Sequence, residues 1–161
     1  MKLYIRQKVF SWADRFTVKD AAGNDRYIVE GELFSWGKKL HVYDRAGTEA
    51  AFIRQELWSF LPKYDVYMGE RQVAQIVKEF SFLFPKYSIQ GPDWEVDGSF
   101  WEHDYEITQN GRNIVSIHKE WMTWGDCYEL DIADPENEIM ALAVVLAIDC
   151  VIEQNNHANN G

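Results

Sequence analysis

The sequence lacks several features that would assign a function at once. Its two cysteines, Cys127 and Cys150, form neither a CxxC pair nor a zinc spacing, so we expect no disulfide framework and no zinc site. The start, MKLYIRQKVF, has no apolar core of a secretory signal, and we therefore expect a cytoplasmic protein. The GxSxG, HExxH and Walker A patterns are also missing. We expect no enzyme, and assign no catalytic, cofactor-binding or metal-ligating residues.

Positive charge is scarce and unevenly spread. The chain has 16 Lys and Arg residues against 26 Asp and Glu residues, a formal net charge of −10. Residues 1–86 hold 14 basic and 11 acidic residues, whereas residues 87–161 hold 2 basic and 15 acidic residues. Nucleic acids and anionic membranes bind clustered Lys and Arg. We therefore expect no nucleic-acid partner, while the mildly basic first half leaves room for an anionic partner there.

Apolar and aromatic residues are abundant. Hydrophobic residues make up 47% of the 161 residues, which include 7 Trp, 8 Tyr and 9 Phe. This content suffices for the core of one ordinary domain and argues against disorder.

The sequence also repeats itself. GTEAAFIRQEL (47–57) aligns with GRNIVSIHKEW (111–121) at an offset of 64. Two copies of a long unit are typical of a duplicated domain rather than of a solenoid. We predict one domain over residues 1–153, with pseudo-repeats at about 10–68 and 72–132.

Within each pseudo-repeat, apolar and polar residues alternate with the period of a β-strand. Turn signals such as AAGND (21–25), RAG (45–47) and QNG (109–111) separate the runs. Because the connections are short, we predict a largely antiparallel sheet. The predicted strands span residues 3–9, 15–20, 26–34, 38–44, 49–57, 63–68, 72–80, 86–90, 93–100, 103–108, 112–120 and 127–132.

The last apolar segment has a different pattern. From Ile139 to Ile152 every residue is apolar except Asp149, so a helix there has no polar face and must be surrounded by lipid or by protein. Its length of about 21 Å is short of the roughly 30 Å hydrocarbon core of a bilayer. We therefore predict no transmembrane segment, but a buried helix over 136–153 followed by a disordered polar tail over 154–161.

A buried helix and twelve strands fit one architecture. A sheet of that many strands, closed into a barrel, has a lumen too wide for its own side chains to fill, and closure removes exposed sheet edges. We predict an all-β fold with one buried helix: a twelve-stranded antiparallel closed barrel around a central hydrophobic C-terminal helix. Asp149 should meet a donor, have a raised pKa or lie at the barrel mouth, of which we favour the mouth. Cys150 should be a small buried apolar residue.

Three segments carry a resemblance to a known family. They are KLHVYDRAGTEAAFIRQELWSFLPKYDVY (39–67), DYEITQNGRNIVSIHKEWMTWGDCYELDI (104–132) and LAVVLAIDCVIE (142–153). With the turn-marked strands they make the chain resemble the LURP-one-related family, as a single-domain member of bacterial type, from about Tyr4 to Glu153. The resemblance implies a tubby-like fold and a relationship to phospholipid scramblases. It implies no catalytic residues, because no activity is established for the family.

Two acidic runs form the first candidate site. Period-two spacing places the carboxylates of each run on one face of its strand, and a hairpin would let both faces share a surface. Opposed carboxylates repel. A hard cation such as Ca²⁺ would relieve this, but a solvated outer face is the interpretation we favour. The six residues are Asp93, Glu95, Asp97, Glu102, Asp104 and Glu106.

Basic residues of the first half form the second candidate. Tubby-domain relatives bind phosphoinositide headgroups, so the resemblance implies an anionic-lipid or phosphate site. Acidic residues lie between the basic ones, and an ordinary solvated surface is the simpler interpretation. The residues concerned are Lys2, Arg6, Lys8, Lys38, Lys39 and Arg45.

Histidine and tryptophan residues complete the candidates. None of the histidines has the sequence context of a catalytic triad. We expect the tryptophans mainly in the core, whereas exposed rim aromatics would indicate contact with a ligand or a membrane. The residues are His41, His103, His118 and His157, and Trp12, Trp36, Trp58, Trp94, Trp101, Trp121 and Trp124.

Two functions follow as hypotheses. The first is a ligand- or anionic-lipid-binding module, which uses the basic residues or a cleft at a barrel mouth and contacts lipid only peripherally. The alternative is a cytoplasmic protein–protein interaction or scaffold protein, which needs an exposed apolar patch. Because the helix should fill the lumen, we expect no cofactor there.

Overall fold

The computed structural model describes residues 1–6, 15–32, 34–83, 86–123 and 125–159. In these residues twelve strands form one antiparallel sheet in the order β8-β7-β6-β5-β4-β3-β2-β1-β12-β11-β10-β9. Ten of the strand pairs thus join neighbours in the sequence, as short connections predict. The strands are β1 Lys2–Arg6, β2 Arg15–Asp20, β3 Asp25–Gly31, β4 Lys39–Tyr43, β5 Glu49–Gln55, β6 Lys63–Met68, β7 Arg71–Glu79, β8 Lys86–Gln90, β9 Glu95–Ser99, β10 Asp104–Gln109, β11 Arg112–Met122 and β12 Gly125–Ile132.

The sheet curves into a nearly closed barrel. Pairing of β1 with β12 brings the two ends of the chain's strand series together, with Leu3 opposite Leu130. The remaining edges, β8 and β9, approach each other at an isolated bridge between Ile89 and Trp94. The predicted fold, antiparallel strands in a barrel with one C-terminal helix, is confirmed.

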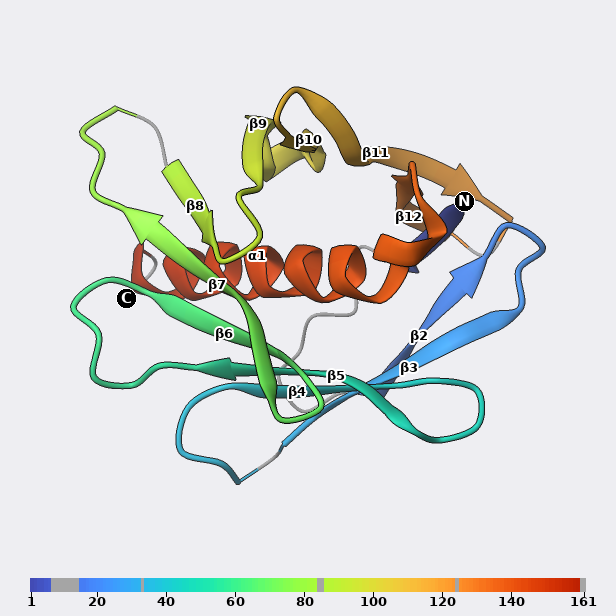
Figure 1. The fold of residues 1–161 in the computed structure, drawn as a ribbon, viewed down its shortest axis with the longest axis horizontal. Helices are drawn as coiled ribbons and strands as arrows, with labels where there is room; N and C mark the ends of the chain where they lie inside the picture. Colours follow the sequence, from blue (N-terminus) through green and yellow to red (C-terminus); the bar gives the residue numbers. More distant parts are fainter. Residues whose placement is uncertain (7–14, 33, 84–85, 124, 160–161) are drawn as a thin grey trace.

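One helix, α1 (Glu138–Asn159), runs through the barrel with strands around it (Figure 1). A 3₁₀ turn at Pro135–Asn137 leads into it, and the Asp134 side chain accepts a hydrogen bond from the Glu136 backbone N–H at 3.0 Å. This is an N-cap that satisfies an otherwise unpaired donor.

The helix is longer than predicted. Residues 154–159 are helical, so the prediction of a disordered tail is wrong for them, and residues 160–161 lie outside the described residues. The barrel supplies the reason. Asn155 is buried and accepts a hydrogen bond from Lys78 at 2.9 Å, and the Tyr64 hydroxyl donates to Gln154 at 3.1 Å. These partners on β6 and β7 hold a polar segment that sequence alone assigns to solvent.

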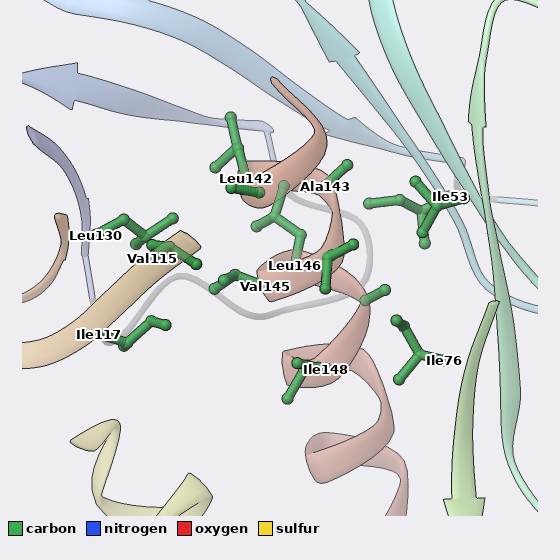
Figure 2. Close-up of a cluster of buried hydrophobic side chains, with 14 of the residues drawn as sticks. Ile53, Ile76, Val115, Ile117, Leu130, Leu142, Ala143, Val145, Leu146 and Ile148 are labelled. Carbon is green, nitrogen blue, oxygen red and sulfur yellow. The ribbon is translucent and has the colours of Figure 1, made fainter. Parts of the chain in front are cut away.

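The core lies between the helix and the inner wall of the barrel. Alternate residues of each strand point inward, and Ile53, Ile117 and Leu130 lie around Val145 and Leu146 of α1 (Figure 2). Ile53 and Ile117, aligned by the sequence repeat, hold equivalent inward positions on β5 and β11. Because apolar side chains fill the lumen, a ligand has to bind elsewhere.

The two ends of the barrel differ. The β3–β4, β5–β6 and β7–β8 loops lie at the end where α1 finishes, whereas the β2–β3 and β4–β5 hairpins lie at the other end of the view (Figure 1). Contacts with the helix agree, because Lys38 of the β3–β4 loop pairs with Glu153 and Arg26 of β3 pairs with Glu138.

Candidate functional site

The acidic strands form the predicted hairpin, but their carboxylates are spread over it. Asp97 of β9 lies directly opposite Glu106 of β10, and Asp104 is 2.9 Å from Nδ1 of His118 on β11. Among the described residues, no three His, Cys, Asp or Glu side chains lie close enough to hold a metal ion. This arrangement favours the solvated face. Asp93, Glu95 and Glu102 lie in the turn before β9, at the start of β9 and in the 3₁₀ turn after it.

The basic residues predicted from the sequence do not form one cluster. Lys2 pairs with Glu129, Lys38 with Glu153 and Lys39 with Glu32, at 2.8, 3.4 and 3.3 Å. Lys8 lies outside the described residues. Arg6 and Arg45 remain, and both line surface cavities.

These cavities form a groove on the outer wall of the barrel. In β1, β2 and β3, inward core residues alternate with outward polar residues, so cations of neighbouring strands share the outer face. The two cavities have volumes of about 510 and 490 Å³ and share Lys19, Asp25 and Ile28. The lining has five cations against the two acids Asp25 and Asp44. We call the five cations the basic groove: Arg6, Arg15, Lys19, Arg26 and Arg45.

Two cations of the basic groove are held firmly by carboxylates. Arg26 donates two hydrogen bonds to Glu138, at 2.8 and 3.0 Å, and the Tyr27 hydroxyl donates to the same carboxylate at 2.8 Å. Burial opposes ionisation of Glu138, yet these hydrogen bonds hold its pKa below the ordinary value. Lys19 donates to Asp25 at 2.6 Å and lowers the pKa of that carboxyl. Arg26 therefore anchors the first turn of α1.

The other cations are better placed for a ligand. Arg15 is 66% exposed and pairs with the exposed Glu30 at 3.2 Å, a contact worth little because water competes for both groups. Arg45 is exposed on the β4–β5 hairpin and lies near enough to Asp20 and Asp25 to help lower their pKa values. Arg15 and Arg45 can therefore turn toward an incoming anion at small cost.

A polar cluster lies inside the barrel, around Asp149. The carboxylate accepts a hydrogen bond from Tyr128 and is 3.2 Å from Nε2 of His103, whose ring stacks on Tyr128 at 4.4 Å between centroids. Burial, and secondly the charge of Asp149, raise the pKa values of Tyr105 and Tyr128. Asp149 is buried, so its predicted place at the barrel mouth is wrong. It meets donors instead, which was the other alternative. Cys150 is buried as predicted.

The remaining histidines bind carboxylates at the surface. His41 lies between Glu49 and Glu32, at 2.6 and 2.8 Å. Burial lowers the pKa of His41, but the two carboxylates outweigh it and raise the value overall. His157, in the last turn of α1, is 3.7 Å from Glu153. These contacts are structural ion pairs.

Tryptophan placement differs most from expectation. Trp94 is buried, but Trp36, Trp58 and Trp121 are exposed, so the expectation of core packing is wrong for these three. The lumen beneath the loops is already occupied by the second half of α1. Eight exposed apolar residues on the β3–β4, β5–β6 and β7–β8 loops form what we call the aromatic rim: Phe34, Trp36, Leu57, Trp58, Phe60, Phe80, Phe82 and Leu83. Trp12, Trp124 and the side chain of Trp101 lie outside the described residues.

A signal for the aromatic rim is present in the sequence. The loops repeat an aromatic–Ser–aromatic pattern, FSW at 34–36, WSF at 58–60 and FSF at 80–82. Alternating apolar and polar residues imitate a strand, and the predicted strands were therefore drawn too far into these segments. The strands end earlier, at Gly31, Gln55 and Glu79.

Comparisons with known proteins agree with this fold. The model of the LURP-one-related family matches residues 1–149. The chain is 35% identical over 153 residues to the uncharacterized protein YxjI of Bacillus subtilis (strain 168), and the match covers 94% of each chain. A solved structure of an Arabidopsis thaliana protein has a TM-score of 0.65 at 16% identity, over 92% of this chain and 90% of that one. At that identity the likeness supports the fold alone.

Among the helices that the structure describes, none is long and apolar enough to cross a membrane.

Proposed function

Since the chain belongs to the LURP-one-related family and apolar side chains fill its lumen, we propose that it is a non-enzymatic binding module. Its ligand, a phosphate-bearing anion, binds outside the barrel in the basic groove. The observation that carries this proposal is the excess of cations over acids, five to two, along two adjoining cavities of a strongly acidic protein.

The chemistry of the groove favours phosphate over other anions. Four of its five cations are arginines, whose planar guanidinium groups donate two parallel hydrogen bonds to phosphate oxygens. The acidic second half of the chain repels anions elsewhere, so the groove is where an anion meets the least opposition. In the cytoplasm, where we expect the protein, this chemistry has two sources: free phosphate compounds and the headgroups of anionic lipids.

The test measures binding by calorimetry at low salt. Inositol hexakisphosphate is the soluble probe, and vesicles containing an anionic lipid are the membrane probe. We expect the double variant Arg15→Gln/Arg45→Gln to bind about tenfold more weakly or less, because each lost charge-assisted hydrogen bond contributes about 1.5–3 kcal/mol. Added salt should weaken binding of the wild type.

A matched control removes the same charge elsewhere. Arg71 and Arg112 are exposed on other hairpins, and Arg71→Gln/Arg112→Gln should bind like the wild type. Equal losses in both double variants would mean that net charge alone governs binding and would refute the groove. No binding of either probe at low salt would refute the proposal as a whole. Binding of one probe only would identify the source of the phosphate.

The alternative function, presentation of a surface to a protein partner, requires an exposed apolar patch. The aromatic rim is such a patch. Its shape, however, suits a softer occupant than a protein.

A further inference from the structure

Three neighbouring loops at one end of the barrel carry apolar side chains that are almost fully exposed. Phe34 is 98% exposed, Trp58 96% and Phe60 99%. Figure 1 shows these loops at the end where α1 finishes. Single exposed apolar residues need no explanation, but eight on adjacent loops indicate an interaction site.

Local structure holds these side chains outward. The Ser35 hydroxyl, between Phe34 and Trp36, donates to the Gly37 carbonyl at 2.6 Å. Ser59 donates to the Leu61 carbonyl at 2.5 Å in the next loop. Each serine thereby satisfies its own hydroxyl within the loop, and the aromatic residues on either side are left outside the turn.

The first two loops also support each other. The Lys38 backbone N–H donates to the Gln55 side chain at 3.0 Å. Gly37 has φ +76° and lies so close to Leu57 that an added Cβ would be 2.6 Å from its Cδ2 atom. A side chain at position 37 would therefore separate the loops, whereas glycine lets them stand side by side as one platform.

Charges behind the aromatic rim cancel. Lys39 pairs with Glu32, Lys38 with Glu153 and Lys86 with Glu79, at 3.3, 3.4 and 3.3 Å. Within the aromatic rim itself every residue is apolar, and the residues between are serines and a glycine. An occupant is therefore selected by its apolar character and not by its charge.

We propose that the aromatic rim inserts into the interfacial region of a lipid bilayer and so docks the barrel on a membrane by this end. Trp and Phe side chains partition into that region, where aromatic residues of membrane proteins gather. The tips project separately; Phe80 and Phe82 are the one pair of rim rings in contact among the described residues, at 5.1 Å between centroids. A rigid protein would need a socket for each tip, whereas lipid flows around them.

This proposal does not rest on the basic groove. The β2–β3 and β4–β5 hairpins, which carry half of the groove, lie at the other end of the view in Figure 1. A docked barrel thus keeps that part of the groove open to water. The two sites also differ in chemistry, because insertion of the aromatic rim needs no anionic lipid and should be insensitive to salt.

The experiment is co-sedimentation of the full chain with vesicles of phosphatidylcholine alone, at low and at high salt. We expect the wild type to bind equally at both. The double variant Trp58→Ser/Phe60→Ser should bind about tenfold more weakly or less, because two fully exposed aromatic side chains lose their transfer into the interface.

The matched control is Trp121→Ser. Trp121 is exposed too, but it lies near the end of β11, far across Figure 1 from the three loops. It should bind vesicles like the wild type. A second pair, Phe82→Ser/Leu83→Ser on the β7–β8 loop, should lose binding as the first does, and circular dichroism with thermal melting checks that both pairs fold.

Three results would overturn the proposal. The wild type would fail to bind neutral vesicles, the rim variants would bind as well as Trp121→Ser, or lipid-free wild type would form a dimer that Trp58→Ser/Phe60→Ser abolishes. The last would assign the aromatic rim to a second copy of the chain. None of them bears on binding of inositol hexakisphosphate, so failure of this proposal and failure of the groove are separate.

Discussion

A carboxylate lies in the middle of an otherwise apolar helix, against the inner wall of the barrel. Asp149 is tolerated there because Tyr128 of β12 donates to it and His103 lies within hydrogen-bond distance. Burial of an unpartnered carboxylate is costly, so the two partners decide whether this residue stabilises or destabilises the fold.

At this residue we predict that Asp149→Leu destabilises the protein, although leucine fits the apolar helix. The substitution leaves the Tyr128 hydroxyl and the His103 ring buried without their partner, at a cost of about 2–4 kcal/mol. Asp149→Asn keeps an acceptor for the hydroxyl and should cost less. Urea denaturation of the three proteins measures the difference. Unchanged or increased stability of Asp149→Leu would mean that no polar contact is required.

At the scale of elements, α1 is fixed to the barrel by polar contacts at both ends. Arg26 and Tyr27 hold Glu138 at the start, and Lys38 pairs with Glu153 near the end. The two ends differ in one respect. Burial lowers the pKa of Lys38 from 10.5 to about 8, although Cys150 and Glu153 favour its charged form.

A pH-dependent stability follows from this anchor. Between pH 8 and 10.5 the unfolded chain keeps a proton on Lys38 that the folded chain has released, so this residue makes stability rise with pH. Relative to Lys38→Met, the wild type should therefore gain about 2 kcal/mol across this window. The difference between the two proteins isolates Lys38, because other titrating groups are common to both. Urea midpoints at pH 7.5 and 10 measure it, and a constant difference would contradict the lowered pKa.

For the whole molecule, the sequence predicts the fold well because the fold depends on local patterns. Period-two alternation locates the strands, and a helix with no polar face, as from Ile139 to Ile152, requires a sheath. The candidate sites depend on contacts between distant residues. Nothing near Asp149 in the sequence points to His103, which reaches it across 46 positions. Likewise, Phe34 and Trp58 have the residue types of a core, and only the filled lumen places them outside.

The filled lumen also makes the barrel and its helix a single folding unit. The inward side chains of the strands pack against α1 along its length, as Figure 2 shows for Ile76 and Ile148. A chain ending at Asp134 would expose this lining to water around a lumen too wide to collapse without strain. We therefore predict that residues 1–134 alone show no near-ultraviolet circular dichroism signal and no cooperative thermal transition.

Co-expression with residues 135–159 as a separate chain should restore both signals, because the helix needs no covalent link to fill the lumen. Restoration should fail when the helix carries Leu146→Asp, which places an unpartnered carboxylate against the strands. Leu146 is fully buried, and Figure 2 shows it in the middle of the apolar cluster. If residues 1–134 folded cooperatively by themselves, the strands would hold a core of their own, and the helix would be an addition to the barrel instead of its centre.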